Sequence, residues 1–194
     1  GMLYRPVRER SVEELVEVAK ASIENTGYEE ISLSSLSSSD YSHINELATR
    51  LTDELCDQRV SLSLPSLRVD KFVQDTLSQT QRVKKSSLTF APEAGTQRLR
   101  EVINKGVTEE DLVNTLHHAF ENGWNGVKLY FMTGLPTETD EDLLGIAELA
   151  KVAAGAYYSV PKDKRVKGLR ITCSASVFVP KPFTPFQWCA QDRP

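Results

Sequence analysis

The sequence predicts an α/β fold in which parallel strands alternate with helices in a single domain, residues 1–194. Short β-type runs alternate along the chain with segments whose apolar residues recur at helical spacing. Such alternation implies parallel strands joined by crossover helices. Of the 194 residues, 40% are hydrophobic and 26% are charged, which is typical of a globular protein with one sizeable core.

The N-terminal part of the chain carries the first two helices and the first strand. Ser11 and Glu14 form a capping-box pattern, and the helix that follows is predicted to end at Gly27. A β-type run covers 29–36. Asp40 is then expected to cap a second helix, whose apolar positions continue to Leu55.

The remaining elements follow the same alternation. Pro65 ends a second strand and Pro92 a third, and Asp70 opens a short helix between them. Further helices are expected over 96–104, 108–122 and 140–157, a fourth strand over 126–134, and a fifth over 169–180. The tail 181–194 is rich in proline and aromatic residues and is expected to be irregular.

Composition excludes several classes of protein. The net charge of −4 and the pI near 5.5 argue against a general nucleic-acid surface. No apolar run approaches the roughly 18 residues that span a membrane, and no signal-peptide pattern begins the chain. The three cysteines, Cys56, Cys173 and Cys189, are too few and too scattered for a disulfide framework, which predicts a cytoplasmic location.

The strand ends are the candidate site, because chemistry in such folds gathers at the carboxyl ends of the strands. Proline or glycine follows four of the five predicted strands, which gives rigid loops with exposed backbone. Turns favour these residues in any protein, so the pattern alone leaves a purely structural reading open. No strand is followed by a glycine-rich dinucleotide or phosphate fingerprint, which disfavours a Rossmann fold.

Four segments together resemble the radical S-adenosylmethionine (SAM) enzymes, in particular uncharacterised Fe–S oxidoreductases of the branch related to methylthiotransferases and coproporphyrinogen oxidases. They are "KLYFMTGLPTETDEDL", "APEAGTQRLREVINKGVT", "VFVPKPFTPFQW" and "GMLYRPVRERS". The resemblance implies a partial (β/α) TIM-like barrel of five parallel strands with outer helices. It also implies that the first strand and the cluster-binding loop of that barrel are missing from this sequence.

The resemblance also implies nine cofactor-binding positions. The peptide groups near Met132 would read the adenine, Gly134 would allow close approach of the backbone, Glu93 would lie near the ribose, and Lys105 would bind the methionine carboxylate. Ser34 and Ser35 stand where many relatives have Gly-Gly-Glu. Arg68 is a further candidate contact, and the strand-end residues Ser66 and Val179 complete the set. Structural alternatives remain for two of these residues. Lys105 would then only complement the dipole at the end of a helix, and Arg68 would be a solvated arginine.

The family's 4Fe–4S cluster is held by three cysteines spaced C-x-x-x-C-x-x-C, and this sequence has no such motif. We therefore expect no metal ligands, no catalytic residue and only weak binding of SAM in this chain. His117 and His118 are neighbours on a predicted helix and cannot both face one metal ion.

Three functional hypotheses follow. The first is a fragment of a radical SAM enzyme, which in its full-length form would cleave SAM reductively to a 5′-deoxyadenosyl radical acting on an unknown substrate. The second is a cluster-free barrel that binds nucleotides or assists protein assembly without catalysis. A third, an unrelated barrel for a phosphorylated metabolite, is disfavoured because the proline-rich segment "VPKPFTPF" cannot supply backbone amides for a phosphate.

The strand predicted over 29–36 would be left unpaired on one edge. Apolar Ile31, Leu33 and Leu36 are interleaved with serines there, and no lysine or proline blocks pairing with another chain. The sequence therefore predicts a homodimer through this open edge.

Overall fold

The computed structural model describes residues 6, 8–34, 38–63 and 88–191. The chain divides into two compact units, one holding the described residues up to 63 and the other those from 88 onward. The single domain over 1–194 stays a prediction.

The first unit contains two helices and two short parallel strands. Its elements are α1 (Val12–Thr26), β1 (Glu30–Ser32), the 3-10 turn η2 (Ser38–Asp40), α2 (Ile44–Leu55), the 3-10 turn η3 (Cys56–Gln58) and β2 (Ser61–Ser63). In register, Glu30 lies opposite Ser61 and Ser32 opposite Ser63. β1 begins at Glu30 and ends at Ser32, short of the predicted 29–36.

The ends of α1 are confirmed as predicted. Ser11 and Glu14 form the capping box, and Gly27 closes the helix in the left-handed region with φ of 70°. The buried side chains of α1 recur at helical spacing and pack with those of α2 in one core: Val12, Val16, Ala19, Ile23, Leu47, Ala48, Leu51 and Leu55.

The prediction that Asp40 caps the second helix is wrong. Asp40 lies in η2, and α2 begins four residues later, at Ile44. The intervening turn is held by the segment before α1. The Tyr41 hydroxyl donates to the carbonyl of Arg10 at 2.8 Å, and the Ser42 N–H donates to Glu9 Oε1 at 3.0 Å. These contacts, distant in sequence, delay the start of the helix.

The second unit is built on a three-stranded parallel sheet in the order β3-β4-β5. Its elements are β3 (Leu88–Glu93), α4 (Gln97–Val102), α5 (Glu109–Glu121), β4 (Gly126–Thr133), α6 (Asp140–Ser159) and β5 (Arg170–Val177). The predicted boundaries agree closely, except that β3 continues through Pro92 to Glu93. The short helix predicted at Asp70 lies outside the described residues.

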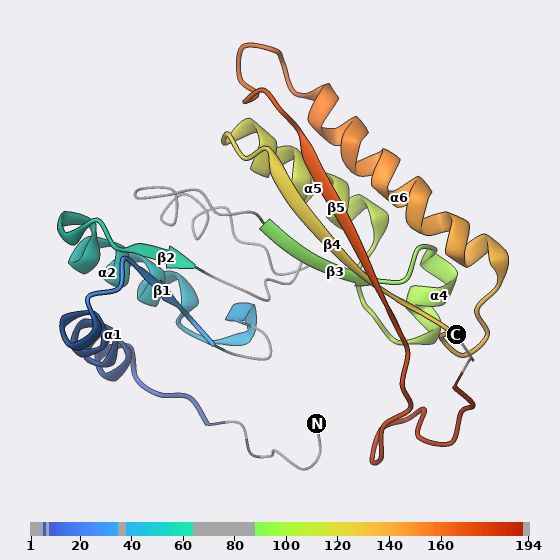
Figure 1. The fold of residues 1–194 in the computed structure, drawn as a ribbon, viewed down its shortest axis with the longest axis horizontal. Helices are drawn as coiled ribbons and strands as arrows, with labels where there is room; N and C mark the ends of the chain where they lie inside the picture. The colour runs from blue at the N-terminus through green and yellow to red at the C-terminus, as the bar shows by residue number, and fades with distance from the viewer. Residues whose placement is uncertain (1–5, 7, 35–37, 64–87, 192–194) are drawn as a thin grey trace. The chain divides into compact units, whose positions relative to one another are not determined.

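The core of this sheet lies on one face. Along β4, Val127, Leu129 and Phe131 are buried, whereas Lys128 and Tyr130 are exposed. Figure 1 shows α5 and α6 along the same face of β3, β4 and β5. The parallel α/β architecture with helices on one face is therefore as predicted. The described strands form two separate sheets and neither is closed, so a single five-stranded partial barrel is not shown. No described helix is both long and apolar enough to cross a membrane.

The predicted homodimer through the edge of β1 remains testable. Within the described residues β1 pairs with β2 alone. Backbone donors and acceptors on the other edge of a strand are a ready template for a second chain. Light scattering of the purified chain should give a mass above the monomer's 21.7 kDa that rises with concentration. A constant monomer mass across a wide concentration range would contradict this prediction.

Candidate functional site

The tips of β3 and β4 lie together and carry three of the predicted site residues, Glu93, Met132 and Gly134. The pairing of the two strands shifts between Phe90 and Glu93, and the last matched pair is Glu93 with Phe131. The carbonyl of Thr133 accepts the N–H of Phe178 at 2.8 Å, on the β5 side of the strand. Because successive residues in a strand direct their peptide groups to opposite sides, Met132 faces β3. Its N–H flanks the Glu93–Phe131 pair, and its carbonyl lies past the end of that ladder.

Glu93 and Lys105 come together beside this point. The Lys105 ammonium lies 3.4 Å from Glu93 Oε1, and both side chains are half-buried. Glu93 has φ of 70°, a left-handed conformation that is uncommon for a residue other than glycine and clusters at functional sites. Lys105 follows the end of α4, where its N–H donates to the carbonyl of Arg100 at 2.7 Å.

Gly134 begins the turn after β4. Its φ of 77° lies in the left-handed region, which explains glycine at this position. Its N–H donates to Glu138 Oε2 at 2.7 Å, and the Glu138 N–H donates to the carbonyl of Leu135 at 3.0 Å. Glu138 thus closes the turn. Glu138 was not among the residues predicted from the sequence, although it stands inside the "TGLPTET" segment.

The other predicted site residues are distributed as follows. Val179 lies two residues beyond β5 and is 49% exposed, close in sequence to the Phe178 contact with β4. Ser34 belongs to the first unit, two residues after β1. The predictions for Ser35, Ser66 and Arg68 lie outside the described residues.

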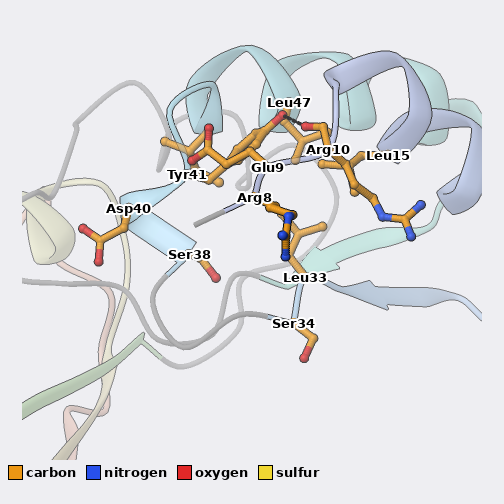
Figure 2. Close-up of a pocket in the computed structure, with 11 residues that line it drawn as sticks. Arg8, Glu9, Arg10, Leu15, Leu33, Ser34, Ser38, Asp40, Tyr41 and Leu47 are labelled. Atoms are coloured by element: carbon orange, nitrogen blue, oxygen red, sulfur yellow. Dashed lines mark hydrogen bonds between the residues drawn. The ribbon is translucent and has the colours of Figure 1, made fainter. Parts of the chain in front are cut away.

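Ser34 borders a hollow of about 280 Å³ in the first unit. Figure 2 shows its lining, with the Arg8 side chain extending toward Leu33 and Ser34. The dashed line marks the hydrogen bond that ties Tyr41 to the backbone of Arg10. The hollow combines an apolar floor, which includes Leu47, with a cation and a hydroxyl at its rim.

A hydrogen-bonded group, here called the Asp142 cluster, joins the loops that follow β3 and β4. Its members are Thr96, Arg98, Thr137, Thr139 and Asp142. Burial of the Asp142 carboxyl opposes its ionisation, but hydrogen bonds from Thr96, Arg98 and Thr139 outweigh this effect and lower its pKa to about 2. Neither Thr96 nor Arg98 was among the residues predicted from the sequence.

Arg100 supports the β3 tip from the core. Its side chain is 1% exposed and its guanidinium donates to the carbonyls of Ala94 at 3.0 Å and Gly95 at 3.2 Å. Burial lowers the pKa of this guanidinium. A buried arginine has no signature in the local sequence, so this contact was also missed.

The described residues offer no ligand set for a metal ion or an iron–sulfur cluster. They contain no group of three or more His, Cys, Asp or Glu side chains placed to hold a metal. Cys173 and Cys189 are free thiols, and burial raises the pKa of the Cys173 thiol, which disfavours the thiolate that a metal needs. The Nδ1 atoms of His117 and His118 lie 3.6 Å and 4.0 Å from Glu121 Oε2 on the same helix.

Comparisons with known proteins agree with the resemblance of the motifs. The sequence model of the Radical SAM superfamily matches residues 2–150. An uncharacterised protein of Methanocaldococcus jannaschii, MJ0966, is 36% identical over 185 residues, which are 95% of this chain and 38% of that protein. The chain thus spans well under half of this relative.

The fold also resembles a solved structure. It matches coproporphyrinogen III oxidase (HemN) from Escherichia coli, described as a radical SAM enzyme, with a TM-score of 0.53 and 13% identity. The match covers 80% of this chain and 42% of that one. At this identity the likeness concerns the fold.

Proposed function

Because the chain belongs to the radical SAM superfamily, we propose that the tips of β3 and β4 bind S-adenosylmethionine. The observation that carries the proposal is the early end of the β3–β4 ladder at Glu93 and Phe131. It leaves the carbonyl of Met132 directed beyond the last matched pair, where it can accept a hydrogen bond from the amino group of an adenine. Its direction in a rigid strand would fix the orientation of the base.

The side chains beside this peptide match the other parts of the cofactor. The Glu93 carboxylate would accept hydrogen bonds from the ribose hydroxyls, and the Lys105 ammonium would pair with the methionine carboxylate. Gly134 has no side chain to obstruct the approach of the ligand. Val179 is a proposed apolar contact beyond β5. Ser34, which belongs to the first unit, stays a prediction from the sequence.

For the whole protein we propose the chemistry of its superfamily. Bound SAM would supply, on reductive cleavage, a 5′-deoxyadenosyl radical that acts on an unidentified substrate. The described residues of this chain do not fit the iron–sulfur cluster, because they contain no set of side chains that could hold it. A non-catalytic nucleotide-binding or assembly module is the weaker candidate, since no observation favours it. The proposal includes the partial (β/α) barrel, a cytoplasmic location and the homodimer predicted from the sequence.

Calorimetry with two ligands tests the proposal. The wild-type chain should bind SAM weakly, with a dissociation constant well above about 1 µM, because the methionine part lacks an iron anchor. Lys105→Met should weaken SAM binding about tenfold through the lost charged contact. The same variant should leave the affinity for 5′-methylthioadenosine unchanged, because that ligand has no carboxylate.

A matched control is Lys151→Met. Lys151 forms an exposed ion pair with Glu148 on α6, and its loss removes the same charge without approaching the strand tips. The proposal would be contradicted if Lys105→Met and Lys151→Met changed the affinity for SAM equally, or if the wild-type chain bound no SAM at all. Sub-micromolar binding by the wild-type chain would show that the cluster contributes less than expected.

A further inference from the structure

Asp142 receives more hydrogen bonds than the start of a helix requires. Its carboxylate, 2% exposed, accepts from the N–H and the hydroxyl of Thr139, each at 2.9 Å, within the first turn of α6. It also accepts from the Thr96 hydroxyl and the Arg98 guanidinium, which come from the loop and helix after β3. Arg98 lies 44 positions and Thr96 lies 46 positions from Asp142 in the sequence, yet both donate to its buried carboxylate.

The capping box of α5 shows what the local contacts alone look like. There Asp111 accepts from the N–H of Thr108 at 3.0 Å and from its hydroxyl at 2.6 Å. The same two contacts begin α6, with Asp142 and Thr139 in these roles. The bonds from Thr96 and Arg98 are additional, and they connect two loops instead of starting one helix.

Arg98 extends the connection into the turn after β4. Its guanidinium donates to the carbonyl of Thr137 at 2.9 Å and to the Thr137 hydroxyl at 3.3 Å. Thr137 has φ of 68°, a conformation that a β-branched residue rarely adopts. A strained backbone of this kind persists where the surroundings fix it, and Arg98 provides such contacts.

Thr96 connects the beginnings of the two helices. Its side-chain oxygen accepts the N–H of Leu99 at 3.3 Å, which caps α4, while its hydroxyl donates to Asp142 of α6. Next to it, Gly95 and Gly145 lie backbone against backbone, so that any Cβ at Gly95 would overlap the first turns of α6. The β3 and β4 tips are therefore held to each other by both packing and hydrogen bonds.

We propose that Asp142, acting through Thr96 and Arg98, is a positioning residue that sets the β3 tip, with Glu93, against the β4 tip, with Met132 and Gly134. This inference rests on the proposed function, because the geometry it fixes is that of the SAM site. Asp142 itself does not touch the cofactor. Its effect on binding comes from the relative placement of the two strand tips.

Methionine methyl signals in NMR spectra provide a local readout. The chain has two methionines, Met2 and Met132, and Met132 packs against the cluster of Ala94, Leu99 and Leu135 at these strand tips. With ¹³C-methyl methionine labelling, Met132→Leu assigns the two signals. Titration of the wild-type chain with SAM should then move the Met132 signal and yield the dissociation constant.

Arg98→Ala, Thr96→Val and Asp142→Asn should each shift the Met132 signal in the ligand-free chain and weaken SAM binding about tenfold, since small displacements of binding groups carry large penalties. Arg98→Lys should restore part of the affinity. The control Asp111→Asn disturbs the equivalent helix start of α5. It should lower the urea midpoint of unfolding but leave both the Met132 signal and the SAM affinity at wild-type values.

The two proposals fail in different ways. If Arg98→Ala and Asp142→Asn leave the Met132 signal unchanged and the affinity within twofold of wild type, Asp142 is only a helix cap and the positioning role is overturned. Effects of Asp111→Asn equal to those of Asp142→Asn would overturn it as well. If the wild-type chain binds no SAM, the proposed function fails, and the ligand-free Met132 signal alone decides whether Asp142 positions the strand tips.

Discussion

Replacing Gly95 with alanine should lower the free energy of unfolding by about 3 kcal/mol, the upper range for overpacking. An added Cβ would lie 2.6 Å from the carbonyl carbon of Gly145 and closer still to backbone atoms of Asp142 and Ile146. These are main-chain atoms of α6, which cannot move aside by changing rotamer. The β3 loop or the helix would have to shift. Urea unfolding followed by tryptophan fluorescence measures the loss, because Trp124 is buried in this unit while Trp188 is 90% exposed.

Gly155→Ala is the matched control on the same helix. Gly155 lies on the exposed side of α6 and has no atom within 4 Å of an added Cβ. Alanine should stabilise the chain there by about 0.5 to 1 kcal/mol, because it favours the helix and restricts the unfolded chain. A loss below about 1 kcal/mol for Gly95→Ala would show that the two loops are less tightly packed than described.

Replacing Asp142 with alanine should cost about 2 to 3 kcal/mol, since several hydrogen-bond donors lose their shared buried acceptor. The same carboxylate makes stability depend on pH. Its pKa is lowered from 3.8 to about 2 in the folded chain, so its contribution is fully present above about pH 4. That contribution, about 2 kcal/mol, is lost as the pH falls from about 4 to about 2. Urea midpoints of the wild type and of Asp142→Asn between pH 7 and pH 2 should therefore converge at the acid end.

Asp140→Asn controls for the general charge of the helix start. Asp140 is an exposed acid of the same first turn, and its loss should cost about 0.5 kcal/mol through the helix dipole alone. A pH dependence of Asp142→Asn that runs parallel to the wild type would contradict the assignment of this acid transition to Asp142.

The positioning role of Asp142 bears on how the superfamily site could be organised in this protein. Glu93 and Met132 come from two strands and Lys105 from the turn after α4, and their mutual placement depends on the segments that follow those strands. In this unit the loops are joined by a buried carboxylate, a guanidinium and two facing glycines. Substitutions in these residues should therefore affect cofactor binding without removing any group that contacts the cofactor.

The sequence by itself determined the features that depend on neighbours in the chain. The capping box at Ser11 and the left-handed Gly27 depend on groups only a few residues apart. The spacing of apolar residues defined the buried face of each helix. The alternation of strands and helices determined that both sheets are parallel. The quoted motifs contain Glu93, Met132 and Gly134, which lie at neighbouring strand tips because strand ends in a parallel sheet share one edge, and Lys105, which contacts Glu93.

Only the tertiary structure decided the features that depend on residues distant in sequence. Asp40 has the chemistry of a helix cap, yet contacts of Glu9 and Arg10 with the following turn moved the helix start to Ile44. The strand bulge that carries β3 past Pro92 to Glu93 comes from its pairing with β4. The bonds of Thr96 and Arg98 to Asp142 cross more than forty residues. A side chain's partners at such separations are set by the packing of whole elements, which no local pattern of residues encodes.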